Sequence, residues 1–203
     1  MPALEPATIA PGPLLDAGRS QLLVIDVQRG LVEAMPPATR ARALAGLELL
    51  AHAAGALGVP TTVTEHLPAR LGRTDPALAA RLTDAAVLAK THFCAAADAA
   101  VVDRLAALDR PSVVVAGMET HVCVLQAALA LAARGWHVHL AFDASAARGA
   151  EDEALARDRA VQAGVVPVSA EMVAFEWLRR GDHPARRGVI AAVKAKAAAL
   201  QAE

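Results

Sequence analysis

The sequence predicts an α/β fold: a doubly wound, six-stranded, mostly parallel sheet with helices on both faces. Short, continuous apolar runs such as residues 22–26 and 112–116 are typical of strands that are covered on both faces. Segments with helical spacing separate these runs, and parallel strands need such crossovers. Glycine or proline marks many of the segment ends, which places the boundaries.

The first half of the chain supplies three expected strands and one long helix. The expected elements are strands at 22–26, 61–65 and 87–90 and a helix at 39–57. Leu44, Leu47 and Leu50 recur at helical spacing, and Gly58 followed by Pro60 ends that helix. A loop containing Pro68, Gly72 and Pro76 joins the second and third strands.

The second half repeats the alternation of strand and helix. The expected elements are helices at 98–108, 120–134 and 151–163, strands at 112–116, 136–142 and 165–168, and two final helices from about 169 and 184. Pro111 and Gly117 flank the clearest strand, while Gly135 and Gly164 end helices. Right-handed crossovers between these strands give the doubly wound sheet.

The length and hydropathy of the chain predict one domain. With 203 residues, of which 55% are hydrophobic, the chain can bury one core, which we place at residues 19–203. Residues 1–18 are rich in proline and glycine and are expected to lie on the surface. The mean hydropathy of +0.36 is high, but charges such as Arg104 and Arg134 interrupt the long apolar stretches, so no membrane span is expected. We interpret the excess of hydrophobic residues as a buried core together with a subunit interface.

Charge and cysteine content exclude several classes of protein. A net charge of −1 and only 2% aromatic residues leave no surface for a nucleic-acid backbone or for base stacking. Cys94 and Cys123 provide neither a disulfide framework nor a zinc-ligand spacing. The N-terminal residues show no basic and apolar regions of a secretory signal. We therefore expect a cytoplasmic protein whose thiols stay reduced.

Polar or reactive residues follow four of the expected strands. They are Asp26 after the first strand, Glu65 after the second, Lys90 after the third and Cys123 in the segment 117–123 after the fourth. Ligands of doubly wound sheets bind outside the carboxyl ends of the strands. The sequence therefore predicts that a carboxylate, an ammonium and a thiol converge there.

This set of groups suits nucleophilic catalysis. Cys123 stands at the start of a helix, where unpaired N–H groups favour a thiolate, and Lys90 adds positive charge. Asp26 can accept the thiol proton and return it to a leaving group. Backbone N–H groups of residues 117–123 are placed to face an oxyanion.

Simpler interpretations exist for each residue. A lone cysteine in an alanine-rich helix is usually a small buried hydrophobic residue, and a lone lysine is usually solvated. Asp26 can bridge the loop after its strand. A thiol redox role, with Cys123 oxidised and Cys94 resolving it, is a further alternative, although the surroundings of Cys94 are apolar.

The local sequences around these residues resemble the isochorismatase-like cysteine hydrolase superfamily. The three stretches that carry the resemblance are residues 23–28 (LVIDVQ), 90–93 (KTHF) and 116–124 (AGMETHVCV). Further stretches resemble the isochorismatase-domain-containing branch; they are 63–68 (VTEHLP) with 71–72, 134–139 (RGWHVH), 143–145 (DAS) with Arg148, and 182–184 (DHP). The likeness extends over residues 20–195.

The resemblance implies a triad of Cys123, Asp26 and Lys90 and a non-proline cis peptide at Met118–Glu119. It also implies that the N–H groups of Glu119 and Cys123 meet the oxyanion. The expected substrates are small amides, carbamoyl compounds or ureas, and members are commonly dimers or larger. The residues expected to line the pocket, besides Glu119, are Gln28, Glu65, His92, Phe93 and His121.

The same resemblance narrows the function. The enzyme that gives the superfamily its name lacks the cysteine, so a true isochorismatase is not expected. Nicotinamidases carry an Asp-x-His-x-x-His metal motif, whereas residues 64–69 (TEHLPA) hold one histidine, so we expect neither a metal nor another cofactor. The alternative to a small-molecule hydrolase is a catalytically idle relative that acts as a binding or scaffolding protein.

Overall fold

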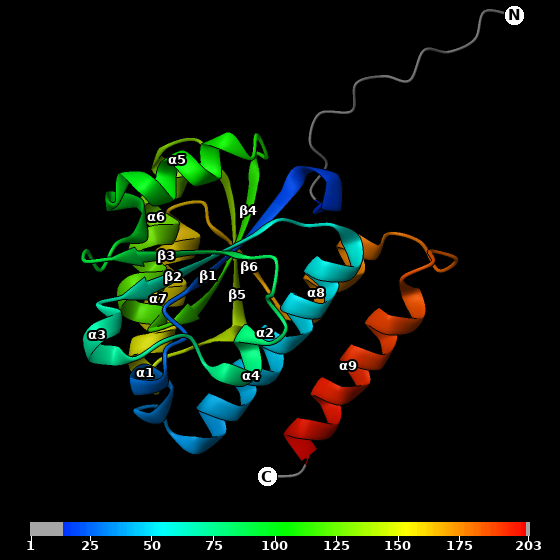
Figure 1. Cartoon of the computed structure of the whole chain (residues 1–203), viewed down its shortest axis with the longest axis horizontal. Coiled ribbons are helices and arrows are strands. Elements are labelled where there is room, and N and C mark those ends of the chain that lie inside the picture. Colours follow the sequence, from blue (N-terminus) through cyan, green and yellow to red (C-terminus); the bar gives the residue numbers. More distant parts are fainter. Residues whose placement is uncertain (1–13, 202–203) are drawn as a thin grey trace, which may run out of the picture.

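The centre of the structure is a six-stranded sheet whose neighbouring strands are all parallel, as the sequence predicts (Figure 1). The computed structural model describes residues 14–201. The strands are β1 (Ser20–Ile25), β2 (Thr61–His66), β3 (Ala86–Lys90), β4 (Ser112–Met118), β5 (His137–Ala146) and β6 (Val166–Val168), in the spatial order β3-β2-β1-β4-β5-β6.

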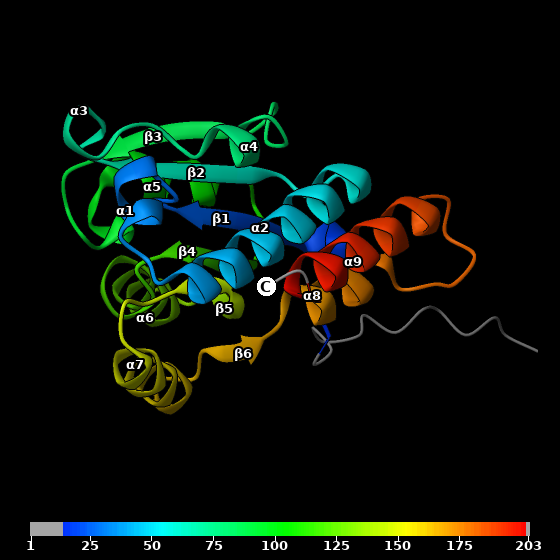
Figure 2. The same ribbon diagram turned by 90° about the horizontal axis from the view of Figure 1, so that it is seen from below.

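Helices cover both faces of this sheet (Figure 2). The α-helices are α1 (Arg29–Glu33), α2 (Pro37–Leu57), α3 (Pro68–Leu71), α4 (Pro76–Ala79), α5 (Ala99–Ala107), α6 (Leu125–Ala133), α7 (Ala150–Gln162), α8 (Ala170–Leu178) and α9 (Arg186–Gln201). Short helical turns are η1 (Ala17–Arg19), η2 (Ala95–Ala97) and the π-helical turn η3 (Thr120–Val124). Within residues 14–201, no helix combines the length and apolar character needed to cross a bilayer.

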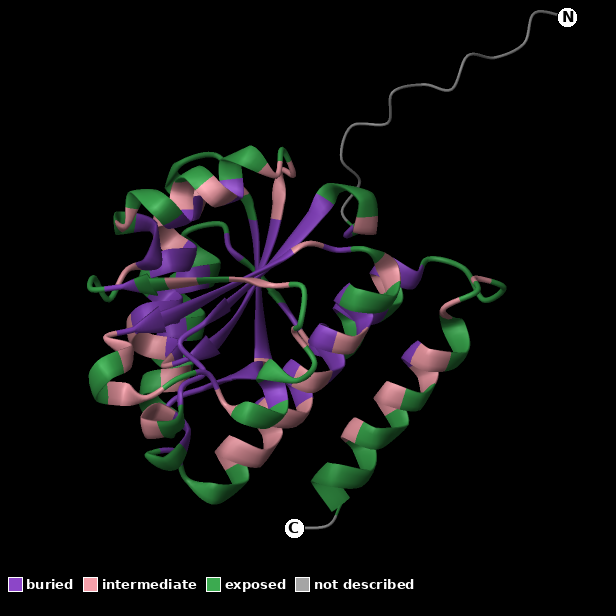
Figure 3. Cartoon of the chain, viewed as in Figure 1, coloured by how far each residue is buried: buried purple, intermediate pink, exposed green. Residues whose placement is uncertain are grey.

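Alternate residues of each strand enter two separate cores, which is why the strand sequences are continuously apolar. In β1, Leu22 and Val24 pack with α2, α8 and α9, whereas Leu23 and Ile25 pack with α5, α6 and α7. The central strands are therefore buried along their length, as Figure 3 shows.

Three features differ from the sequence expectation. β5 continues to Ala146, because after a shift in register Gly117 pairs with Ser145, and the polar Asp143 concealed this extension. The helix expected from residue 120 begins with the π-helical turn η3. Residues 1–13 of the expected surface segment lie outside the described part, but Leu15 is buried and its N–H donates to Glu176 Oε2 at 2.7 Å.

Gly117 allows the ends of β1 and β4 to approach closely. Its φ is +134°, and a Cβ built on it would lie 2.0 Å from the carbonyl oxygen of Ile25. Only glycine fits both the torsion and the contact. The residue thus fixes the spacing of the two strands that precede Asp26 and the η3 turn.

The variant Gly117→Ala is expected to lose about 3 kcal/mol or more of unfolding free energy, because backbone atoms must move to admit the methyl group. Urea unfolding followed by circular dichroism measures the loss. Gly55→Ala is the matched control: nothing lies within 4 Å of its Cβ position in α2, so it should gain about 0.5–1 kcal/mol. Equal stability of the two variants would contradict this role of Gly117.

Candidate active site

The candidate site lies where the strand order reverses. β1 is flanked by β2 and β4, and the chain winds outward from this pair in both directions. In open α/β sheets the crevice at such a reversal, outside the carboxyl ends of the strands, is the usual place for a ligand. Asp26 follows β1 there, Lys90 ends β3, and Cys123 lies in η3 after β4.

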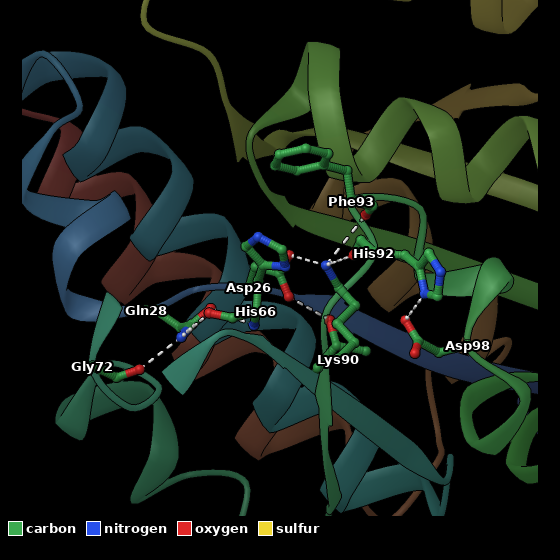
Figure 4. Close-up of polar contacts among 9 residues, drawn as sticks. Asp26, Gln28, His66, Gly72, Lys90, His92, Phe93 and Asp98 are labelled. Carbon is green, nitrogen blue, oxygen red and sulfur yellow. Dashed lines mark hydrogen bonds and ion pairs between the residues drawn. The ribbon is translucent and has the colours of Figure 1, made fainter. Parts of the chain in front are cut away.

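Asp26 and Lys90 form a fully buried ion pair (Figure 4). Lys90 Nζ lies 2.5 Å from Asp26 Oδ2, and neither side chain is exposed. The hydroxyl of Thr64 donates to Asp26 Oδ1 at 2.7 Å. Asp26 adopts a φ of +51°, a torsion that costs free energy for a residue other than glycine and is common at functional sites.

The ammonium of Lys90 has three oxygen partners. Besides Asp26, it donates to the carbonyl of His92 at 3.0 Å and to that of Phe93 at 3.2 Å. An ammonium has three N–H donors, so its hydrogen-bonding capacity is used within the protein. This arrangement compensates for burial of the charge and fixes the carboxylate of Asp26 from one side.

Cys123 lies next to this pair and is 5% exposed. Burial, together with the charge of Asp26 and a hydrogen bond to it, raises the pKa of the Cys123 thiol to about 12. Lys90 acts in the opposite direction, and Glu119 raises the pKa further. The expectation that the helix start lowers this thiol pKa is therefore wrong, because burial and the adjacent carboxylate outweigh it. The thiol is protonated at neutral pH.

The η3 turn connects Cys123 to the end of β4. The Met118–Glu119 peptide bond is cis, and Met118 is buried in the core. The carbonyl of Glu119 accepts the N–H groups of Val122 and Val124 at 3.1 and 3.2 Å. The Glu119 side chain forms an ion pair with Arg148, with 2.6 Å between Glu119 Oε1 and Arg148 Nε.

Two residues expected to line the pocket instead fix the segment that follows β2. The Gln28 amide donates to the carbonyls of His66 and Gly72 at 3.0 and 2.6 Å and accepts the N–H of His66 at 2.7 Å. Glu65 Oε1 accepts the backbone N–H and the hydroxyl of Thr74 at 2.8 and 2.9 Å. Both side chains are buried with these bonds made, so they position the loop.

The remaining expected pocket residues differ in their placement. Phe93 is 56% exposed, with its ring centroid 5.0 Å from that of His66. His92 turns toward Asp98, with 3.1 Å between Nδ1 and Oδ2 (Figure 4), and its carbonyl rather than its ring reaches the ion pair. His121 is half-buried, and its Nε2 lies 3.9 Å from Asp152 Oδ2.

Sequence reasoning did not single out Thr64 and His66 as functional residues. Thr64 pairs in register with Ile25, which brings its hydroxyl to Asp26. Burial, followed by the charge of Lys90, lowers the pKa of His66, so this histidine is neutral at physiological pH. The sequence signal for Thr64 was its polarity: it is a polar residue in a buried parallel strand, and the neighbouring strand ends in an acid.

The described residues offer no ready metal centre, and a large cavity lies elsewhere. Between residues 14 and 201, no three His, Cys, Asp or Glu side chains are grouped so that they can hold an ion. A cavity of about 730 Å³ is lined by α7 and by residues of β6 and α8, including Arg148 and Phe142, and does not contain Asp26, Lys90 or Cys123.

The fold and the site define a doubly wound α/β protein with polar groups gathered at the reversal of its strand order. The chain belongs to the isochorismatase family, because the model of the isochorismatase domain matches residues 20–172. This relation supports a hydrolase in general.

Two curated relatives illustrate the range of the family. Isochorismatase domain-containing protein 1 of Salmo salar is 33% identical over 144 residues, which are 70% of this chain and 50% of the salmon protein. The chain thus spans about half the length of that relative. The secreted isochorismatase effector Isc1 of Phytophthora sojae is 32% identical over 203 residues, covering 96% of this chain and 93% of that protein.

Two solved structures share the fold over most of their length. The MAR1 ribonuclease from Caenorhabditis elegans superposes with a TM-score of 0.83 at 29% identity, covering 89% of this chain and 92% of that one. The YcaC gene product of Escherichia coli, an octameric hydrolase of unknown specificity, gives a TM-score of 0.81 at 26% identity, with coverages of 94% and 92%.

Proposed function

We propose that the chain is a cysteine-dependent hydrolase that cleaves an amide-like C–N bond of a small molecule through an acyl-enzyme on Cys123. The observation that carries the proposal is the buried carboxylate of Asp26, whose Oδ1 accepts the hydroxyl of Thr64 and whose Oδ2 pairs with Lys90. The charge of this carboxylate and its hydrogen bond to the thiol both act on the pKa of Cys123. A nucleophile, a base and a group that orients the base are the three parts of such a site.

The raised thiol pKa determines how the first step proceeds. Because the thiol is protonated at rest, the attack of Sγ on the carbonyl carbon is coupled to transfer of the thiol proton to Asp26. The new S–C bond forms as the carbonyl π electrons move to oxygen. Lys90 stabilises the carboxylate before the transfer and cannot drift away, since two carbonyl groups also hold it.

The second half of the cycle uses the same proton. When the tetrahedral intermediate collapses, the C–N bond breaks and protonated Asp26 gives its proton to the departing nitrogen. Asp26, a carboxylate again, then removes a proton from the water that attacks the thioester. As this second intermediate collapses, the C–S bond breaks and Asp26 returns the proton to Sγ, which releases the acid and restores the thiol. We place the backbone N–H groups of Glu119 and Cys123 opposite the oxyanion in both halves.

The proposal extends to assembly and location. The exposed apolar side chains of Leu155, Met172 and Phe175 give the chain surface for a homo-oligomer, and the octameric hydrolase of similar fold supports one. A mass above that of the monomer by light scattering is the expected result. A reducing, cytoplasmic location suits a free Cys123, whereas the secreted name of the Phytophthora relative points the other way.

The function is tested with a panel of small primary amides, N-carbamoyl compounds and esters. We expect release of ammonia or amine over many turnovers, and an acyl adduct on the Cys123 peptide that hydroxylamine removes, as a thioester requires. Cys94→Ala should behave as wild type, because its sulfur contacts the carbonyl of Gln126 and not the site. A folded protein that neither releases product nor acquires an adduct across the panel would favour the idle binding protein instead.

A further inference from the structure

The end of β5 and the start of α7 meet the turn that holds Cys123. Arg148, in the loop between these two elements, pairs with Glu119, the residue that precedes that turn, and Asp152 of α7 faces His121 within the turn. The Glu119–Arg148 distance of 2.6 Å is that of a charge-assisted hydrogen bond. The turn is thus held by charged groups from outside the sheet.

Glu119 adds a second carboxylate whose charge acts on the thiol. Its side chain is only 13% exposed, whereas that of Arg148 is 62% exposed. Three charged groups act on the thiol: Asp26 after β1, Lys90 of β3 and Glu119 after β4. Lys90 compensates Asp26 directly, with 2.5 Å between Nζ and Oδ2, which leaves Glu119 to be compensated from elsewhere.

We propose that Arg148 is a positioning residue of the active site: by binding Glu119, it neutralises a carboxylate that otherwise opposes ionisation of Cys123. Arg148 acts through Glu119 and does not itself touch the reacting atoms. The proposal rests on the proposed function in one respect only, namely that Cys123 is the nucleophile.

A charge role of Arg148 and a purely structural role predict different effects of the variants on ionisation of Cys123. If the ion pair only holds the turn in shape, removing either partner breaks the same contact and has the same effect. If Arg148 compensates the charge of Glu119, Arg148→Gln makes the thiol harder to ionise, and Glu119→Gln makes it easier to ionise. The two single variants then have effects of opposite sign.

The test measures alkylation of Cys123 by iodoacetamide against pH, with adducts mapped by peptide mass spectrometry. Well below the thiol pKa the rate follows the thiolate fraction, so a pKa change of half a unit alters it about threefold. We expect alkylation about threefold slower in Arg148→Gln and about threefold faster in Glu119→Gln. In the double variant Arg148→Gln/Glu119→Gln, the rate should lie near that of the wild type, because both charges of the pair are gone.

Two further variants serve as controls. Arg148→Lys keeps the positive charge and should restore most of the wild-type rate. Arg180→Gln breaks an exposed pair of similar geometry, in which Arg180 donates to Asp182 at 2.8 Å, and should leave alkylation of Cys123 unchanged. Cys94 in the same samples reports any general change in reagent or fold.

The outcomes separate this inference from the proposed function. Slowing by the same factor in Arg148→Gln and Glu119→Gln, or a double variant that is as slow as Arg148→Gln, would overturn the charge-compensating role. Because alkylation needs no substrate, failure of the amide panel to yield product would count against the hydrolase and leave the thiol measurement intact.

Discussion

Replacement of Cys123 by alanine is expected to reduce kcat/KM for any cleaved substrate by at least about 10⁴-fold, since the acyl-enzyme cannot form. The fold should persist. The side chain is small and nearly buried, and the Asp26–Lys90 pair with its Thr64 and backbone partners stays in place. Steady-state kinetics and a thermal melt of the same sample measure the two quantities.

The serine variant sharpens the comparison. Cys123→Ser replaces the thiol by a hydroxyl, which is a weaker nucleophile at the same position, so residual turnover above that of the alanine variant is expected. Cys94→Ala provides the matched control for loss of a thiol and should keep full activity, because the sulfur of Cys94 contacts the carbonyl of Gln126. Activity above a few per cent in Cys123→Ala would place the nucleophile elsewhere.

The sheet could be predicted from the sequence because the hydrophobic pattern and the positions of glycine and proline indicate the same element boundaries. The run 112–116 between Pro111 and Gly117 is one example: both faces of β4 are buried from Val113 onward, so the residues that follow Ser112 are apolar. The extension of β5 was not predictable in the same way. Its last residues pair only after a shift in register, which depends on the partner strand.

The residues of the candidate site could be predicted from the sequence, but the pKa of its thiol could not. Each strand end could be read from the chain, and parallel strands bring their ends together, so the contact of Asp26 with Lys90 follows from topology. The thiol pKa depends on how deeply the turn is buried and on which charge lies nearer, and neither is local in the sequence. Gln28 and Glu65 show the same limit, because their partners at Gly72 and Thr74 lie on a loop.

Asp26→Asn is expected to separate the acidity of the thiol from catalysis. The carboxylate raises the pKa of Cys123 both by its charge and by its hydrogen bond, so removing it lowers that pKa, and Lys90 then acts unopposed by Asp26. Alkylation at neutral pH should become faster. Turnover should nevertheless fall by about 10²–10⁴-fold, because no group remains to carry the proton from sulfur to the departing nitrogen.

The pH dependence of Cys123 alkylation measures the change in the thiol pKa and shows its direction. In the wild type, alkylation of Cys123 should rise about tenfold per pH unit toward pH 12, since the protonated thiol predominates below its pKa. In Asp26→Asn the same rise should level off at a lower pH, while hydrolysis is lost at every pH.

Thr64→Val, which removes only the hydroxyl donor to Asp26, should leave the alkylation profile nearly unchanged and cost about tenfold in turnover. It also supplies a test should burial of an unpaired Lys90 prevent Asp26→Asn from folding. Parallel loss of alkylation and turnover in a folded Asp26→Asn would mean that the carboxylate generates the thiolate at rest, and the coupled proton transfer proposed for the first step would be wrong.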